Sequence, residues 1–139
     1  MCIRYRIHRN LQVVHTIIDD QTDAIDLRAY SDQLKKDPDF DSAFDHMIEF
    51  SKTDPSSSGT EAAQVFSHLV PPVARAQMVI VAPGDLEFGI ARQFQSIYQL
   101  PDDVFAVFRD QSKALAWFGL ESNQVEWGAW HSVLKGGEA

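Results

Sequence analysis

The sequence predicts an α/β domain in which a mixed, mostly parallel five-stranded sheet is flanked by helices, in the order ββαβαβαβα. Three features predict it: alternating apolar and polar residues near the N-terminus, two unbroken apolar runs further along, and helical periodicities between the predicted strands. The chain of 139 residues is close to the usual size of a single domain and can bury roughly 70% of its unfolded surface. It is therefore long enough to build its own core.

The first two strands are predicted from a period of two. Residues 3–8 and 11–17 alternate apolar with polar side chains on either side of a short link, Arg9-Asn10. This alternation is typical of half-buried strands joined in a hairpin. An amphipathic run from about Asp23 to Lys36 then predicts a helix, which ends at Asp37-Pro38 because the residue before a proline disfavours helical geometry. The predicted buried face of this helix carries Leu27, Tyr30 and Leu34.

The remaining strands and helices alternate, as they do in parallel-strand units. Residues 46–50 predict the third strand, and an apolar stripe over residues 62–70 predicts a helix that a Pro-Pro pair ends. Met78–Ala82 and Val104–Phe108 are apolar without interruption, which suits strands covered on both faces. We expect these two strands side by side at the centre of the sheet. The last helix is expected over residues 110–119, with an aspartate as N-cap and a glycine as C-cap.

The turn after the first apolar run, Pro83-Gly84-Asp85, is expected to join a strand to a helix without binding phosphate. Phosphate loops direct several glycine N–H groups at the ligand, whereas this turn has one glycine followed by an acid. Asp85 is expected as the N-cap or in the first turn of the helix. Gly89 is expected to let another backbone come close, and Arg92 to be solvated or to contact a partner. The predicted buried stripe is Leu86, Ile90, Phe94 and Ile97.

The composition restricts the classes of function. The 20 acidic against 12 basic residues give a net charge of −8, which disfavours nucleic acid as a partner. Cys2 is the only cysteine, so neither an internal disulfide nor a cysteine-rich metal site is available, and a reducing compartment is expected. The N-terminus lacks the apolar core of a signal peptide, and no segment reaches the roughly 18 apolar residues of a membrane span. We expect a soluble cytoplasmic protein without stable membrane insertion.

The histidines predict no metal site, and no cofactor is expected. They lack the HExxH spacing and are expected at surface or hairpin positions, which are residues 8, 15, 46, 68 and 131. Arg4, Arg6 and His8 share one face of the first strand, and this cationic stripe is open to solvation, anion binding or partner binding. The C-terminal extension is too apolar for a solvated tail and is expected to dock. Its apolar residues are Val125, Trp127, Trp130, Val133 and Leu134.

Several stretches taken together resemble a known family. They are Asp37-Pro-Asp-Phe-Asp41 before the third strand, Ala74-Arg75 leading into Val79–Pro83, Phe88–Phe94, and Val107–Asp110 followed by Ala114–Phe118. Over about residues 3 to 120 the chain resembles the SpoIIAA-like proteins, small bacterial domains with the STAS fold (sulphate transporter and anti-sigma-factor antagonist). The resemblance implies a STAS-like domain over residues 1–120, followed by the Trp-containing extension 121–139. It also implies a protein-interaction or signalling module more than an enzyme.

A serine-rich segment corresponds to the switch motif of the wider STAS group. Anti-sigma-factor antagonists carry Asp-Ser-Ser-Gly at the start of the second major helix, where the first serine is phosphorylated. The same location here reads Asp54-Pro-Ser-Ser-Ser-Gly-Thr60, in which two residues separate the acid from the matching serine. Ser57 and Ser58 are therefore candidate phosphorylation sites. Ser58 also forms an S-x-x-E capping box with Glu61, which needs no switch.

The sequence thus predicts a non-catalytic protein-interaction or regulatory module, which self-associates as a homodimer. Two alternatives stay open. One is a binder of a small apolar or anionic ligand at the carboxyl ends of the parallel strands, and the other is a small hydrolase that uses polar residues there. No residue is assigned a catalytic role; the hydrolase alternative would use Asp54, Ser57, Asp85 and Arg109. The candidate ligand or partner contacts are Asp54, Asp85, Arg92, Arg109, Trp127 and Trp130.

Overall fold

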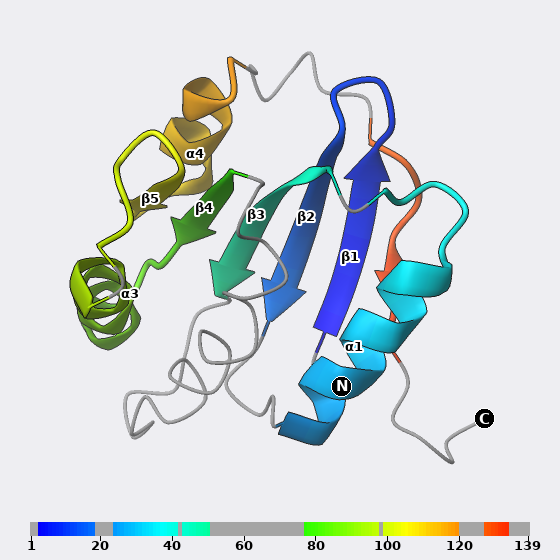
Figure 1. Ribbon diagram of the computed structural model, residues 1–139, viewed down its shortest axis with the longest axis horizontal. Helices are drawn as coiled ribbons and strands as arrows, with labels where there is room; N and C mark the ends of the chain where they lie inside the picture. Colours follow the sequence, from blue (N-terminus) through cyan, green and yellow to red (C-terminus); the bar gives the residue numbers. More distant parts are fainter. Residues whose placement is uncertain are drawn as a thin grey trace.

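The structure, a computed structural model, describes residues 3–18, 24–41, 43–50, 77–97, 99–119 and 127–133. Its elements are β1 (Ile3–His8), β2 (Val13–Ile18), α1 (Ala24–Lys36), β3 (Asp45–Phe50), β4 (Met78–Val81), α3 (Asp85–Ile97), β5 (Phe105–Phe108), α4 (Gln111–Trp117) and β6 (His131–Ser132) (Figure 1). The predicted α/β class is confirmed, and the elements from β1 to α4 lie within a few residues of their predicted positions. The helix predicted over residues 62–70 lies outside the described residues.

Within the ranges just given, the sheet has six strands in the order β5-β4-β3-β2-β1-β6. β1 pairs antiparallel with β2, and the strands from β2 to β5 run parallel, as predicted. Two features differ from the prediction. The C-terminal extension adds a sixth strand, β6, that pairs with Arg4 and Tyr5 of β1, and β5 lies at an edge, although it does pair with β4. β6 was missed because a strand of two residues has no detectable period. β5 looked central because it is apolar, but it is apolar because α3 and α4 cover its opposite faces.

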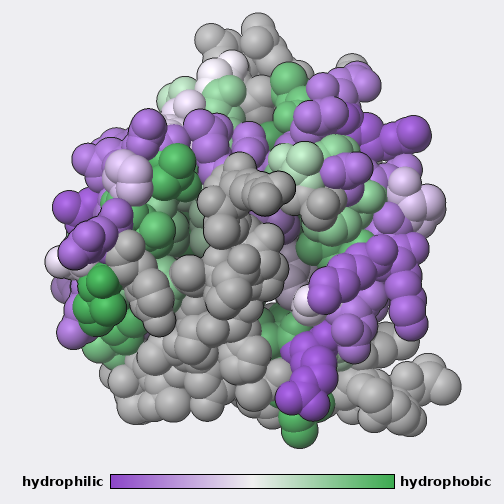
Figure 2. All heavy atoms as spheres, in the orientation of Figure 1, coloured by the Kyte–Doolittle hydropathy of each residue, from purple (hydrophilic) through white to green (hydrophobic). Residues whose placement is uncertain are grey.

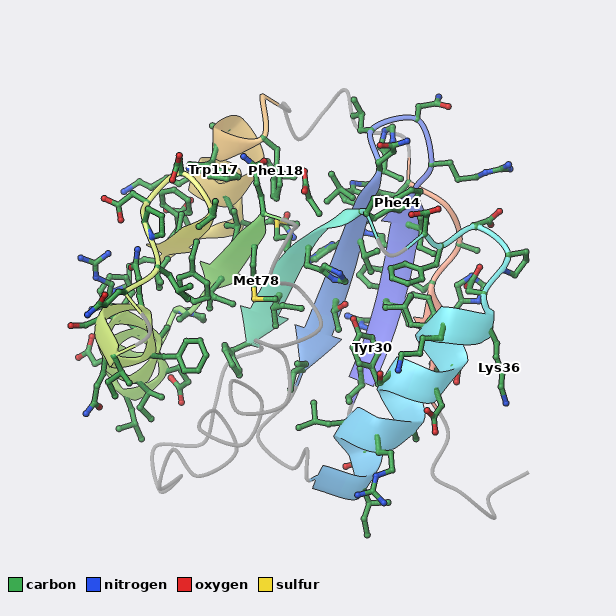
Figure 3. The ribbon with its side chains drawn as sticks, in the orientation of Figure 1. Tyr30, Lys36, Phe44, Met78, Trp117 and Phe118 are labelled. Carbon is green, nitrogen blue, oxygen red and sulfur yellow. The ribbon has the colours of Figure 1, made fainter. Side chains whose placement is uncertain are left out.

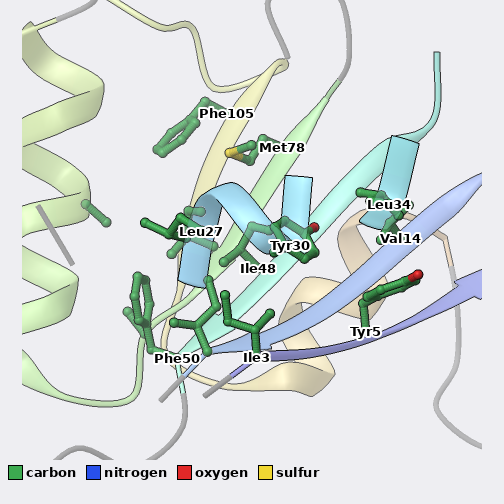
Figure 4. Packing of buried hydrophobic residues seen from close by; sticks show 14 of the residues in the cluster. Ile3, Tyr5, Val14, Leu27, Tyr30, Leu34, Ile48, Phe50, Met78 and Phe105 are labelled. Atoms are coloured by element: carbon green, nitrogen blue, oxygen red, sulfur yellow. The ribbon is translucent and has the colours of Figure 1, made fainter. Parts of the chain in front are cut away.

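The helices α1 and α3 lie on the same face of the sheet. Each parallel strand is added on the same side of the one before it, and right-handed connections then place both helices on one face. Leu27 and Tyr30 of α1 point toward Ile48 of the sheet (Figure 4), and Phe94 of α3 belongs to the same buried cluster. The opposite face, which we call the far face, is left to the residues that follow β5.

α1 buries the face that its sequence predicts. Leu27, Tyr30 and Leu34 are all buried, and the Tyr30 hydroxyl lies 2.8 Å from Thr16 Oγ1 inside the core. The outer side of the helix is hydrophilic (Figure 2), and Lys36 in its last turn points away from the sheet (Figure 3). A fully buried leucine contributes roughly 1.5–3 kcal/mol, so this stripe fixes α1 on the sheet.

The buried stripe predicted for α3 is confirmed for Phe94 and for Ile90, which packs against the core, and is wrong at its two ends. Leu86 and Ile97 are 44% and 65% exposed, whereas Phe94 and the polar Gln95 are buried. Gln95 faces inward because it satisfies backbone groups near β5: its side-chain amide donates to the carbonyl oxygen of Phe105 at 2.9 Å. A prediction built from apolar residues alone misses a buried amide of this kind. It therefore assigns part of the wrong side of the helix to the core.

Gly89 does not mark a close approach of another backbone, contrary to the prediction. A Cβ at this exposed position would meet no described atom within 4 Å. We expect Gly89→Ala to raise the free energy of unfolding by about 0.5–1 kcal/mol, because alanine loses less backbone entropy in a helix. Urea denaturation measures this, and a less stable variant would contradict it. Gly128→Ala is the matched contrast and should destabilise, since its Cβ would lie 3.0 Å from the Ile7 carbonyl oxygen.

α4 covers part of the far face. Its N-cap is Asp110, as predicted, and the Asp110 carboxylate accepts the backbone N–H of Lys113 at 2.9 Å. Gly119, one residue beyond the C-cap, has a φ of 79°, the left-handed geometry that ends many helices. Beneath α4 lies a second buried cluster, made of Met47, Val79, Val81, Ala106, Ala114 and Leu115. The far-face surface of β1 and β2 is left for another segment.

Candidate functional site

Two arginines of β1 interleave with two tryptophans of the C-terminal extension on the far face. The guanidinium carbon of Arg4 lies 4.8 Å from the ring centroid of Trp130, and that of Arg6 lies 4.5 Å from the same ring. Arg6 is also 4.7 Å from the ring centroid of Trp127. The order is therefore Arg4, Trp130, Arg6, Trp127, and we call these four residues the Arg–Trp stack.

The geometry of a β-strand explains this spacing. Side chains two residues apart on one strand face are separated by about 7 Å, which leaves room for one aromatic ring between two guanidinium planes. Arg4 and Arg6 satisfy this condition, since the strand alternation predicted from the sequence places both on the far face. Their positive charges lie against the electron-rich faces of the rings, an interaction of about 0.5–2 kcal/mol per contact.

Backbone hydrogen bonds hold the extension in this position. Gly128 donates its N–H to the carbonyl oxygen of Ile7 at 3.0 Å, and Val133 donates to that of Ile3 at 3.0 Å. Glycine suits position 128 because a Cβ there would lie 3.0 Å from the Ile7 carbonyl oxygen and would force a small shift of the backbone. The prediction that the extension docks is confirmed for residues 127–133, and the surface it covers is the cationic stripe.

Behind the stack, Arg6 begins a chain of hydrogen-bonded polar side chains that crosses three strands, with His15 buried and the others partly buried. Arg6 Nε donates to Nδ1 of His15 at 3.0 Å, and Nε2 of His15 lies 2.9 Å from Oε1 of Glu49. Gln111 of α4 donates to the same Glu49 oxygen at 2.9 Å. Because a guanidinium can only donate, Nδ1 of His15 must accept. His15 is therefore neutral, with its proton on Nε2 and donated to Glu49.

Burial and hydrogen bonding set the ionisation of this chain. His15 is fully buried at 0% exposure, and burial lowers its pKa although Glu49 acts in the opposite direction. Burial alone would raise the pKa of Glu49, but the hydrogen bonds from His15 and Gln111, with the nearby charge of Arg6, lower it overall. Burial also lowers the pKa of Arg6. Neutral His15 thus joins a cation to an anion, and both of its ring nitrogens are occupied.

The candidate residues Asp85 and Arg109 lie at a different place, at the carboxyl ends of β4 and β5. Arg109 donates to the Asp85 carboxylate at 2.6 Å, and its guanidinium carbon lies 4.2 Å from the ring centroid of Phe88. The Asp85 side chain is 97% exposed. As expected, Asp85 lies in the first turn of α3. The two candidates are thus partners of each other on the surface.

The other candidate residues are separate from this pair. Arg92 lies on the exposed side of α3 and donates to Oε1 of Gln95 at 3.0 Å. Trp127 and Trp130 lie over β1, at the other side of the sheet from β5. The positions of Asp54, Ser57 and Ser58 fall outside the described residues. The predicted site is therefore divided among at least three places on the molecule.

The expectation that the histidines occupy surface or hairpin positions is confirmed for His8 and His15, which lie in the β1–β2 hairpin, and for His131, and it is wrong for His46 of β3. His8, His15 and His46 are buried, and His131 is exposed, while position 68 is outside the described residues. His15 is covered on the far face by Trp127 and Trp130, and His46 lies against Phe40 of the loop before β3. His46 Nδ1 has no hydrogen-bond partner within the described part of the chain.

An open cavity of about 870 Å³ lies at the hairpin end of the sheet. The β1–β2 turn, the loop between α1 and β3, and the extension around Trp127 form its walls. This is the amino end of the parallel strands, whereas the sequence led us to expect a ligand at their carboxyl ends. Phe44, beside the hairpin in Figure 3, marks its position. We call it the hairpin cavity.

Comparisons with known proteins identify no relative. No family model, no curated protein and no solved structure matches the chain. Among the described residues, no helix is both long and apolar enough to traverse a bilayer. The same residues contain no group of three or more histidines, cysteines or carboxylates arranged to hold a metal ion.

Proposed function

We propose that the protein is a non-catalytic protein-interaction or regulatory module that docks an acidic partner segment on the Arg–Trp stack. The observation that carries the proposal is the ordered, partly exposed pair of Arg4 and Trp130. Trp130 is 39% exposed, and Arg4 beside it is exposed as well. Tryptophan and arginine are the residue types most enriched among the few side chains that dominate binding energy at protein interfaces.

The stack is also ordered before a partner arrives. Trp130 lies between two guanidinium groups, and its segment is tied to β1 by the N–H groups of Gly128 and Val133. Ordering a free side chain on binding costs about 0.5–1.5 kcal/mol, and this cost is already met within the folded chain. A rigid stack of this kind supports tight recognition by a small number of side chains.

Charge favours an acidic partner. The chain carries a net charge of −8, yet the exposed end of the stack presents the guanidinium of Arg4. An acidic segment is attracted to this place and repelled by most of the remaining surface. The charge distribution therefore fixes where the partner binds as well as attracting it. An acidic surface of a second copy meets the same conditions, so the homodimer predicted from the sequence is one form of this proposal.

A non-catalytic role is supported by how the titratable side chains are used. Both ring nitrogens of His15 are hydrogen-bonded inside the protein, and Asp85 is paired with Arg109. A general base needs a free nitrogen or oxygen within reach of a substrate proton. The resemblance to SpoIIAA-like proteins also supports an interaction module, and the lone Cys2 supports a reducing compartment such as the cytoplasm.

Short labelled peptides rich in aspartate and glutamate test the proposal, with lysine-rich peptides of the same length as a control. We expect the acidic peptides to bind, and Trp130→Ala to weaken binding at least tenfold. Arg4→Gln should weaken it several-fold and reduce its salt dependence. Arg92→Gln is the matched control, because it removes an exposed arginine from α3, away from the stack.

Two outcomes would refute this function. Equal losses in Arg4→Gln and Arg92→Gln would mean that only the overall charge matters. Unchanged binding in Trp130→Ala would place the interface elsewhere. Sedimentation of the unliganded protein then reports whether a second copy is the partner, since Trp130→Ala should shift any dimer toward monomer.

A further inference from the structure

We propose that the hairpin cavity binds a flat aromatic compound that carries no net charge and has a hydrogen-bond acceptor at one end and a donor at the other, such as an aromatic amide. This site lies apart from the exposed end of the Arg–Trp stack and does not depend on the proposed function. Its volume of about 870 Å³ falls within the usual range for small-molecule sites, about 300–1,000 Å³.

Aromatic rings in the walls favour a flat ligand. Phe40 and Phe44 line the cavity from the α1–β3 loop, with ring centroids 6.0 Å apart in an edge-to-face arrangement. Trp127 lines it from the extension, and its ring position is fixed by contacts with Arg6 and His8. Aromatic side chains bind another ring by offset stacking or edge contacts. The rings come from separate segments, so a flat compound can touch more than one of them.

A histidine N–H group in the wall provides the donor. His8 lines the cavity and is only 6% exposed. Its Nδ1 accepts the backbone N–H of Leu11 at 3.2 Å, so this nitrogen carries no proton. The proton of the neutral ring is therefore on Nε2, which has no acceptor among the described residues. This N–H is not sealed from solvent, so it is free to donate to an acceptor on a bound ligand.

Charges of both signs in the walls argue against a charged ligand. Arg9 of the hairpin pairs with Asp39 of the opposite loop, with Nε and Oδ1 3.3 Å apart. The hairpin side thus presents donors from His8 and Arg9, and the loop side presents carboxylates from Asp39 and Asp41. An anion would meet these carboxylates, and a cation would meet Arg9. A dipolar compound without net charge avoids both conflicts, with its acceptor toward the hairpin and its donor toward the loop.

A series of three compounds of equal size tests the charge requirement: indole-3-carboxamide, indole-3-carboxylate and 3-(aminomethyl)indole. NMR titration of the folded full chain, followed at the ring of His8 and the indole N–H of Trp127, measures binding. We expect the amide to bind at least tenfold more tightly than the anion or the cation. Equal or tighter binding of either charged compound would overturn the proposal.

Two variants test the location. His8→Phe keeps a ring of similar size and removes the donor, so affinity for the amide should fall at least fivefold. This change also leaves the Leu11 N–H without its acceptor. A second variant therefore keeps His8: Ala129→Trp fills the cavity and should abolish binding. Ala116→Trp, on the exposed side of α4, is its control and should bind normally. Full affinity in Ala129→Trp would overturn the site, and its result is independent of acidic peptide binding.

Discussion

Replacing Arg6 by alanine should lower the free energy of unfolding by about 2–4 kcal/mol and release the C-terminal extension from the sheet. Arg6 contacts both tryptophan rings, each worth about 0.5–2 kcal/mol. It also donates to His15, and a hydrogen bond to a charged group contributes about 1.5–3 kcal/mol. The estimate is smaller than the sum of these contributions because burying part of the guanidinium has its own cost.

Urea denaturation and amide hydrogen exchange together measure this effect. In Arg6→Ala the N–H groups of Gly128 and Val133, which bond to β1, should lose their protection before the strands unfold. Arg4→Ala is the matched control: Arg4 is exposed, and of the two tryptophan rings in the described extension it contacts that of Trp130, so it should cost about 1 kcal/mol or less. Unchanged protection of Gly128 in Arg6→Ala would show that the stack does not hold the extension.

Arg6→Lys separates charge from shape. Lysine keeps the positive charge but lacks the flat guanidinium that fits between two rings and the Nε–H that reaches His15. We expect a loss of stability between those of wild type and Arg6→Ala, measured by the same denaturation. A lysine variant as stable as wild type would mean that charge alone accounts for the contribution of Arg6.

The strands of the sheet could be predicted because burial imposes a period on the sequence. β1 alternates since one of its faces is in the core and the other carries Arg4 and Arg6, and β4 is uniformly apolar since both faces are covered. What failed was the place of β5 in the sheet and the two ends of the buried stripe of α3. The apolar pattern shows that both faces of a strand are covered. It does not show whether the strand lies at the centre or at an edge of the sheet.

The Arg–Trp stack could not be predicted from spacing, because its two halves lie at opposite ends of the chain. The sequence placed two arginines on one strand face and predicted that the extension docks, but it gave no reason to join them. Such a reason lies in the topology. When the crossover helices α1 and α3 gather on one face, the other face must be covered by whatever follows the last crossover, and that is α4 and the extension.

His15 shows a second limit of prediction from sequence. On an alternating strand it occupies a polar position, which suggests exposure to solvent. In the folded chain this position lies under both tryptophans, with ring centroids 5.5 Å from Trp127 and 5.4 Å from Trp130. The polar residue is tolerated there because Arg6 and Glu49 satisfy its two nitrogens. Polarity alone therefore did not distinguish a solvated face from a buried hydrogen-bonded one.

Acid should destabilise the protein through His46, by about 3 kcal/mol between pH 6.5 and pH 4. Burial lowers the pKa of His46 from 6.5 to about 4. In this interval the unfolded chain binds a proton at this residue and the folded chain does not, so the free energy of unfolding falls as the pH falls. One pKa unit corresponds to about 1.4 kcal/mol, which sets the size of the effect. The lowered pKa of His15 acts in the same direction.

His46→Leu isolates this contribution, with stability measured by urea denaturation at several pH values. The variant should lose about 3 kcal/mol of the acid-induced change. Near neutral pH it should be as stable as wild type or more so, because it removes a buried Nδ1 that has no partner among the described residues. Ile48→Val, two positions along the same strand face, should cost about 0.5–1.5 kcal/mol equally at every pH. If His46→Leu kept the full pH dependence of wild type, the acid sensitivity would have to come from other groups, with His15 the first to examine, since its pKa is also lowered from 6.5.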